Sequence, residues 1–138
     1  MTEELLIYTD GGARGNPGPA AIGVYIINKE GKELARLSQR IGEATNNMAE
    51  YRAVIAALEW VKENFSKERI GKIKIFLDSD LLVNQLTGTF KIKKSHLRNL
   101  IIKVKQLEQE LGRNIYYKYI PREKNKVADF LVNSSFYR

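Results

Sequence analysis

The chain contains no cysteine, and histidine, tryptophan and methionine are scarce. Its 138 residues include one histidine, one tryptophan and two methionines. Without cysteine, neither a disulfide framework nor a zinc–thiolate site can form. Long hydrophobic runs are also missing, so no segment is predicted to span a membrane. The acidic start, Met1–Glu4, leads directly into an apolar run and excludes a secretory signal, so we expect a cytoplasmic protein with no membrane partner.

The composition is that of an ordinary globular protein with an excess of positive charge. Hydrophobic residues make up 43% and charged residues 28%, and the length suffices for a domain with its own core. We find no internal repeat, low-complexity segment or linker, and expect a single domain over residues 1–138. The net charge of +7 favours a polyanionic partner, nucleic acid before a membrane surface, although many basic proteins bind nothing anionic.

The most distinctive stretch of the sequence lies near the N-terminus. The apolar run Leu5–Tyr8 is typical of a short buried strand, which delivers Asp10 to its end. The segment Gly11–Pro19 is rich in glycine, asparagine and proline, and its open backbone beside a carboxylate suits a metal ion or a phosphate. The alternative is a hairpin turn at Asp10–Gly11, because Asp-Gly between apolar runs is a strong turn signal. The stretch alone leaves these two interpretations equal.

Hydrophobic periodicity predicts the element order β-β-β-α-β-α-α-β-α. Strands are predicted at Leu5–Tyr8, Ala20–Asn28, Lys32–Ile41, Ile73–Leu77 and Ile115–Ile120. Apolar residues three and four apart predict helices at Asn47–Phe65, Asp80–Leu86, Leu97–Leu111 and Lys126–Ser134. Short turns join the first strands into an antiparallel meander, whereas strands joined through helices need parallel pairing. We therefore expect an α/β fold with a mixed five-stranded sheet flanked by helices.

Two of the predicted strands lead to an aspartate, Asp10 and Asp78. If these strands are parallel neighbours, the two carboxylates emerge side by side at the carboxyl edge of the sheet, where ligands usually bind in α/β proteins. Their repulsion favours a divalent cation, and oxygen ligands without cysteine or histidine favour Mg²⁺ or Mn²⁺ over zinc. The alternative for Asp78 is the N-cap of the next helix, a position that Ser79 or Asp80 could also fill.

Two further acidic residues have simpler interpretations when each is considered alone. Glu50 lies three residues after Asn47, which is the spacing of a capping box at the start of the clearest predicted helix. Asp129 lies off the apolar side of the last predicted helix, as a solvated residue would. The local patterns therefore favour a capping role for Glu50 and a surface position for Asp129.

Four segments together resemble the type 1 ribonuclease H family, in its compact archaeal and bacterial form. They are Tyr8–Gly12 with Gly15–Pro19, Thr45–Tyr51, Asp78–Ser79 and Asn125–Asp129. Each segment is moderately specific, but all four in this order and spacing are very specific. The resemblance extends from Leu5 to about Asn133 and implies a ribonuclease H-like fold, in agreement with the predicted element order. It implies a catalytic domain alone, without a separate hybrid-binding domain before it.

The resemblance implies a metal-dependent endonuclease that cuts the RNA strand of RNA–DNA hybrids and leaves 5′-phosphate and 3′-hydroxyl ends. It implies that Asp10 bridges two Mg²⁺ ions, with Mn²⁺ as a substitute. It further implies that Glu50 and Asp78 hold the ion near the leaving oxygen, and that Asp129 holds the ion that activates water. These implied roles replace the local interpretations of Glu50 and Asp129.

The resemblance also implies contacts to the substrate, which is read by shape and 2′-hydroxyl groups rather than by base sequence. The implied contacts are Gly11, Asn16, Thr45, Asn46, Asn47 and Phe90, with Thr45 at a phosphate of the DNA strand. Without the family, the small polar residues among these are equally well explained as loop and cap residues. Double-stranded RNA is a second candidate substrate, and we expect the protein to act as a monomer.

The sequence departs from the family pattern at three places. The loop Pro121–Lys124 lacks the histidine that many members carry, and Arg122 is the candidate to replace it. The single histidine, His96, lies at the start of a predicted helix and is expected on the surface or in packing. The family's basic protrusion is shortened to Phe90–Lys94, and this basic stretch is explained equally well as a solvated lysine face. Asp80 adds a carboxylate where a neutral residue often stands.

Two other functions compete with hybrid cleavage. The first is nucleic-acid binding without catalysis, because fold does not fix function. The second is cleavage of DNA by a two-metal nuclease or transposase-like enzyme on the same fold. The intact acidic set argues against the first, since a pure binder gains nothing from carboxylates facing phosphate. Asn16, Asn46 and Asn47 favour an RNA-reading protein over the second.

Overall fold

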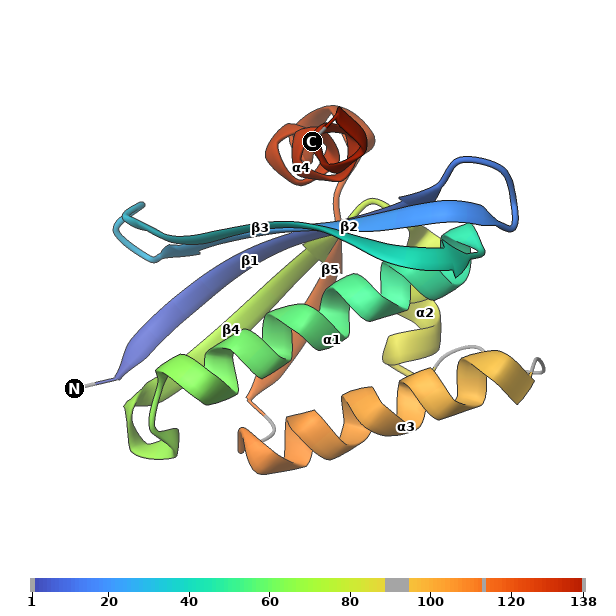
Figure 1. Ribbon diagram of the computed structural model, residues 1–138. Coiled ribbons are helices and arrows are strands. Elements are labelled where there is room, and N and C mark those ends of the chain that lie inside the picture. Colours follow the sequence, from blue (N-terminus) through green and yellow to red (C-terminus); the bar gives the residue numbers. More distant parts are fainter. Residues whose placement is uncertain (1, 89–94, 113, 138) are drawn as a thin grey trace.

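The predicted element order is confirmed by the computed structural model, which describes residues 2–88, 95–112 and 114–137 (Figure 1). The strands are β1 (Glu3–Ala13), β2 (Gly18–Asn28), β3 (Glu33–Ala44), β4 (Ile70–Leu77) and β5 (Ile115–Tyr119). The helices are α1 (Asn46–Asn64), α2 (Asp80–Leu86), α3 (Ser95–Glu110) and α4 (Lys126–Ser134), with 3-10 turns at Lys67–Arg69, Arg122–Lys124 and Ser135–Tyr137. None of the helices in the described ranges is long and apolar enough to cross a membrane.

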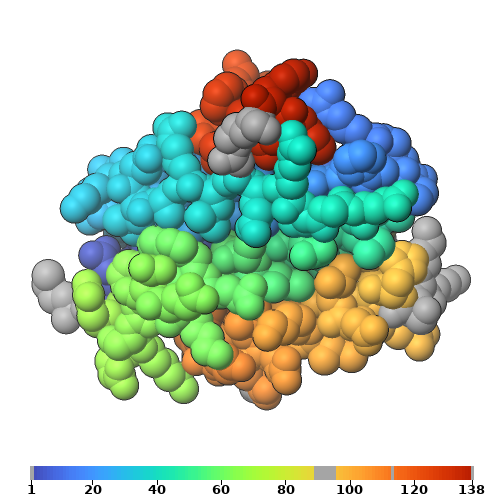
Figure 2. Space-filling model, in the orientation of Figure 1, coloured from blue at the N-terminus to red at the C-terminus, as the bar shows by residue number. Residues whose placement is uncertain are grey.

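The strands form one mixed sheet in the order β3-β2-β1-β4-β5. β2 runs antiparallel to both β1 and β3, whereas β4 runs parallel to β1 and β5 parallel to β4. α1, α2 and α3 lie on one face of the sheet, and α4 packs on the other face against β1, β2 and β3 (Figure 1). In the space-filling view, α4 and residues 135–137 form a ridge above the strands (Figure 2). The predicted α/β fold is therefore confirmed.

β1 is longer than predicted, and this changes the setting of Asp10. Its pairing with β2 continues through the glycines to Ala13, which lies opposite Ala20, and the turn of the hairpin falls at residues 14–17. The prediction of a strand end at Asp10 with a loop from Gly11 is wrong, and so is a turn at Asp10–Gly11. The hydrogen-bonded ladder to β2 outweighs the local turn preference of the Asp-Gly pair, because β propensity depends on the neighbouring strand.

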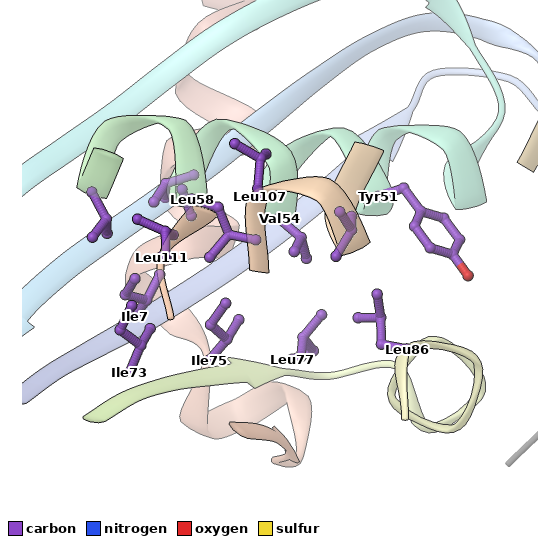
Figure 3. Close-up of a cluster of buried hydrophobic side chains, with 14 of the residues drawn as sticks. Ile7, Tyr51, Val54, Leu58, Ile73, Ile75, Leu77, Leu86, Leu107 and Leu111 are labelled. Carbon is purple, nitrogen blue, oxygen red and sulfur yellow. The ribbon is translucent and has the colours of Figure 1, made fainter. Parts of the chain in front are cut away.

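The hydrophobic core lies between the sheet and the helices α1 and α3 (Figure 3). Tyr51, Val54 and Leu58, from the predicted apolar stripe of α1, are fully buried. Burying a Val or Leu side chain contributes roughly 1.5–3 kcal/mol to folding. The Tyr51 hydroxyl also donates a hydrogen bond to Gln85 Oε1 in α2 at 2.6 Å. These contacts fix the first half of α1, and with it Glu50, against the sheet.

Two glycines let α1 and α4 approach the sheet closely from opposite faces. A Cβ atom at Gly11 of β1 would lie 2.3 Å from the backbone carbonyl of Ala49 in α1. A Cβ atom at Gly23 of β2 would lie 2.3 Å from the carbonyl oxygen of Ala128 in α4. Side chains cannot come so close to a backbone, so only glycine permits these contacts. Each alanine directly precedes an acidic residue, so the two close approaches bring one carboxylate of each helix towards β1.

Candidate functional site

Four carboxylates from separate elements line one pocket of about 730 Å³. They are Asp10 of β1, Glu50 of α1, Asp78 after β4 and Asp129 of α4. Asp10 is only 8% exposed, and the other three residues are part-buried. The structure thus brings together all the acidic residues that the sequence assigned to a metal site.

The parallel pairing of β1 with β4 places Asp10 near Asp78. The last pair of this ladder is Tyr8 with Phe76, and each aspartate lies two residues further along the chain. Side chains two residues apart on a strand face the same side, so the register directs both carboxylates to one edge of the sheet. β4 ends at Leu77, so its ladder with β1 stops before Asp10.

The capping alternatives for two of the carboxylates are wrong. The N-cap of α1 is Thr45, whose hydroxyl accepts a hydrogen bond from the Met48 N–H at 3.1 Å. Glu50 therefore lies beyond the capping box and lines the pocket instead. The N-cap of α2 is Ser79, one of the residues that the sequence offered for that position, so Asp78 does not cap the helix.

The carboxylates influence one another electrostatically. Burial, followed by the charge of Asp78 and smaller effects of the other two carboxylates, raises the pKa of Asp10 from its ordinary 3.8 to about 8. Burial and then Asp78 raise the pKa of Glu50 from 4.5 to about 7, against the lowering effects of Ser79 and Arg122. Desolvation and like charges both disfavour ionised carboxylates. In the absence of a cation, the cluster therefore retains protons near neutral pH.

The side chains that line the pocket are of the chemical type that binds a divalent cation. The described lining residues offer carboxylate oxygens with neither cysteine nor histidine, which suits a hard cation such as Mg²⁺. A cation would also remove the repulsion that raises the pKa values. Among the described residues, no three acidic or histidine side chains converge as they do around a metal ion. The pocket supplies suitable ligands, and binding an ion would require them to draw together.

Asn125 connects three of the segments that carry the carboxylates, a role that the sequence did not predict. It is 1% exposed, and its Nδ2 donates to the Thr9 carbonyl and to Asp78 Oδ2, both at 2.9 Å. Its own carbonyl accepts the Asp129 N–H at 3.1 Å. Although Asn125 occupies the N-cap of α4, its side chain makes no capping hydrogen bond. Asp129 is part-buried and lines the pocket, so the solvated surface position that its local pattern favoured is wrong.

Two asparagines predicted as substrate contacts join the β1–β2 turn to the start of α1. Asn16 Oδ1 accepts the Asn46 N–H at 2.9 Å, and Asn46 Oδ1 accepts the Ala13 N–H at 2.8 Å. Both asparagines are exposed, and Asn46 lines the carboxylate pocket. The bonds therefore hold two polar side chains at the rim of the pocket.

The other residues predicted to contact the substrate do not all lie at the pocket. Thr45 is the N-cap of α1, and Asn47 is the second residue of that helix and part-exposed. Gly11 lines the pocket, but its Cα faces the backbone of Ala49, so packing also requires glycine there. Phe90 lies outside the described residues.

Two arginines supply positive charge at the pocket. Arg122 lies in the 3-10 turn before α4 and lines the pocket, as does Arg14 from the β1–β2 turn. The Arg14 guanidinium lies 4.5 Å from the ring centre of Phe136, a residue that also lines the pocket. Sequence reasoning missed Arg14, although its position in the glycine-rich stretch was a usable signal. His96 is exposed on α3 and is not among the described lining residues.

Comparisons with known proteins cover nearly the whole chain. A family model described as reverse transcriptase-like matches residues 8–135. A bifunctional protein of Mycobacterium tuberculosis is 38% identical over 133 residues, which are 96% of this chain and 35% of that protein. Ribonuclease HI of Haemophilus ducreyi is 35% identical over 118 residues, which are 83% of this chain and 72% of that protein. The chain therefore spans only 35% of the first curated relatives that it matches.

A solved structure matches this fold over nearly the whole of both chains. LC11-RNase H1, isolated from compost, has been crystallised in complex with an RNA/DNA hybrid. That structure matches with a TM-score of 0.91 and 44% identity, and the match covers 95% of each chain. At this similarity, the sheet order and the positions of the helices are shared.

Proposed function

Because the chain belongs to the ribonuclease H family, we propose that it is an endonuclease that cuts the RNA strand of RNA–DNA hybrids. The observation that carries the proposal is that Asp10, Glu50, Asp78 and Asp129, from four separate segments, line one pocket. The crystallised complex of LC11-RNase H1 with an RNA/DNA hybrid supports the choice of substrate. Cleavage would leave 5′-phosphate and 3′-hydroxyl ends.

We assign the carboxylates to two divalent cations, Mg²⁺ by preference and Mn²⁺ as a substitute. Asp10, the most buried, would be shared by both ions, Glu50 and Asp78 would hold one, and Asp129 the other. Bound there, the pair would activate a water molecule and stabilise the departing 3′-oxygen. The pKa values of about 8 for Asp10 and about 7 for Glu50 mean that protons compete with the ions. Ion binding should therefore strengthen as the pH rises through this range.

Polar and basic groups at the rim would position the duplex. The side-chain oxygens of Asn16 and Asn46 are engaged in holding the rim, so their amide N–H groups are the parts that would donate to the substrate. Arg14 and Arg122 would face phosphate groups. Arg122 would take the place of the family's histidine through its charge and its hydrogen-bond donors.

We further propose that residues 1–138 form one domain that acts as a monomer in the cytoplasm. All the carboxylates come from a single chain, so the site needs no partner copy. The minor-groove reading of A-like duplexes leaves double-stranded RNA as a second substrate.

The proposal is tested with end-labelled RNA–DNA hybrid, double-stranded RNA and double-stranded DNA, each in Mg²⁺, Mn²⁺ or EDTA. We expect cleavage of the RNA strand of the hybrid in Mg²⁺ and its loss in EDTA. Binding of the hybrid without cleavage in either metal would overturn the enzymatic function. Cleavage of double-stranded DNA in place of the hybrid would assign the pocket to a DNA nuclease.

Replacing Asn125 should impair cleavage more than folding. In Asn125→Ala, Asp78 loses its donor, and we expect a roughly ten- to hundredfold lower rate, as for other residues that orient metal ligands. The loss in stability should be only about 1–2 kcal/mol, because the buried Asn125 Oδ1 has no hydrogen-bond partner among the described residues and disappears with the substitution. Rates at increasing Mg²⁺, with thermal unfolding in parallel, measure both effects.

Two further variants make the Asn125 prediction specific. Asn125→Asp keeps the volume but replaces the donor by an acceptor beside Asp78, so its rate should fall at least as far as that of the alanine variant. Asn99→Ala removes an exposed asparagine of α3 and should change nothing. If Asn125→Asp kept the parental rate and Mg²⁺ requirement, Asn125 would serve packing alone.

A further inference from the structure

Five side chains form a row across the sheet on the face that carries α4. In strand order they are Arg36, Tyr25, Tyr8, Phe76 and Lys118, each opposite the next in register. Residues paired across strands project from the same face, so three aromatic rings lie side by side with a cation at either end. We call these five residues the aromatic row. Asp10 follows two residues after the central tyrosine, so the row borders the carboxylate pocket on the same face.

The rings of the aromatic row contact one another and are only partly covered. The ring centres of Tyr8 and Phe76 are 4.9 Å apart, and those of Tyr8 and Tyr25 are 6.0 Å apart. The Arg36 guanidinium lies 5.2 Å from the centre of the Tyr25 ring. All three aromatic residues are part-exposed. Neighbouring aromatic side chains that remain partly exposed on a small protein can mark a binding surface.

A second pocket, of about 260 Å³, opens between the aromatic row and the segment that leads into α4. It is lined by both tyrosines of the row, by Lys124 and Lys126, and by Asn125. The two lysines are exposed. Asn125 is the residue that binds the Asp78 carboxylate, so this pocket lies directly beside the carboxylate site.

Positive charge surrounds the aromatic row. Lys118 at its end is exposed, and Tyr116, two residues earlier on β5, is 53% exposed. The acidic residues nearby are Glu33, which binds the Arg36 side chain at 2.9 Å, Glu4, which binds Lys74 at 3.4 Å, and Glu123 at the second pocket. Aromatic rings interleaved with lysines match the chemistry of a single-stranded nucleic acid, whose bases stack on rings and whose phosphates bind lysine.

We propose that the aromatic row and the second pocket bind a single-stranded extension of the RNA strand whose duplex part lies at the carboxylates. The inference rests on the proposed function, because the RNA strand must reach the carboxylates for its extension to pass Asn125. A base would enter the second pocket against Tyr8 and Tyr25, and Lys124 and Lys126 would contact phosphates. Since stacking tolerates any base, this surface selects unpaired RNA rather than a sequence.

The inference is tested by the affinity of Asp10→Asn, in which cleavage is suppressed, for hybrids with different ends. The probes are a blunt hybrid, hybrids with six unpaired nucleotides on the 5′ or the 3′ end of the RNA strand, and the same extensions on the DNA strand. We expect one RNA extension to tighten binding about five- to tenfold, the range that stacking one or two bases supplies. Tyr25→Ala and Lys118→Glu, each added to this protein, should remove that gain and leave blunt-hybrid affinity unchanged.

Lys118→Glu alters an exposed side chain, so it tests the surface even if Tyr25→Ala fails to fold. Lys67→Glu makes the same charge change in an exposed 3-10 turn before β4 and should preserve the gain. The inference is overturned if no RNA extension tightens binding, if DNA extensions do so equally, or if the gain survives Lys118→Glu. It is also overturned if Tyr25→Ala and Lys118→Glu change only self-association in sedimentation. Cleavage of the blunt hybrid by the parent protein reports on the proposed function separately.

Discussion

Asp10→Asn should lower the rate of hybrid cleavage by at least about a thousandfold, a loss typical of removing a central catalytic group. Asparagine keeps the shape of the side chain but carries no charge. Asp10 is the carboxylate whose pKa is raised by all three of the others. Single-turnover cleavage of a blunt hybrid in Mg²⁺ measures the effect. Asp80→Asn makes the same chemical change at the only aspartate outside the cluster, which is exposed, and should stay within about threefold of the parent.

The same substitution, which should nearly abolish cleavage, should also make the free energy of unfolding less sensitive to pH. The pKa of Asp10 is raised from 3.8 to about 8 in the folded protein, so the unfolded chain loses this proton first as the pH rises. Without divalent cations, the parent should therefore lose stability as the pH rises from about 4 through 8, and Asp10→Asn should lose less. Thermal unfolding in EDTA at pH 5 and pH 9 tests this. An equal pH dependence in both proteins would contradict the burial of an ionisable group at this position.

The fold could be predicted because its signals are local. Alternation marks the strands, steps of three and four mark the helices, and a helical crossover forces parallel pairing. The same locality explains the error at Asp10. The Asp-Gly pair signals a turn by itself, but the ladder to β2 extends to Ala13 and carries the turn past the glycines. This pairing depends on residues of β2, so the dipeptide alone cannot indicate it.

The carboxylate site could be predicted only in part from the residues themselves. Asp10 and Asp78 follow from strand pairing, which the element order already contains. Glu50 and Asp129 depend on how closely α1 and α4 approach the sheet, and that distance is set by Gly11 and Gly23 on other elements. No local pattern carries this information, so only the family resemblance pointed to these two residues.

The cap of α1 illustrates a different difficulty. Thr45, Asn46 and Asn47 are consecutive residues that can each cap a helix, so the sequence does not select among them. The selection is tertiary: Asn46 is used to hold the β1–β2 turn through Ala13, and Asn16 binds the Asn46 N–H. Thr45 is left as the cap. The capping box expected for Glu50 failed for this reason.

Gly11→Ala should lower both the stability of the protein and the rate of hybrid cleavage. The added Cβ would lie 2.3 Å from the carbonyl carbon and oxygen of Ala49 and 2.6 Å from the Glu50 nitrogen, so α1 must move away from β1. These neighbours are backbone atoms and cannot rotate aside, so we expect a loss of about 3 kcal/mol or more in the free energy of unfolding. Hybrid cleavage should fall by at least about a hundredfold, because Glu50 moves with the helix. Denaturant unfolding and single-turnover cleavage measure the two effects.

Gly12→Ala provides the matched control, since its Cβ would meet only the Val132 and Asn46 side chains at 3.9 and 4.0 Å. That variant should lose less than about 1 kcal/mol. The comparison separates two roles for Gly11. If it serves only to let the substrate approach, Gly11→Ala will keep its stability and lose affinity for the hybrid. If it sets the distance between α1 and β1, stability and the Mg²⁺ dependence of cleavage will change together, because the position of Glu50 relative to the other carboxylates depends on that distance.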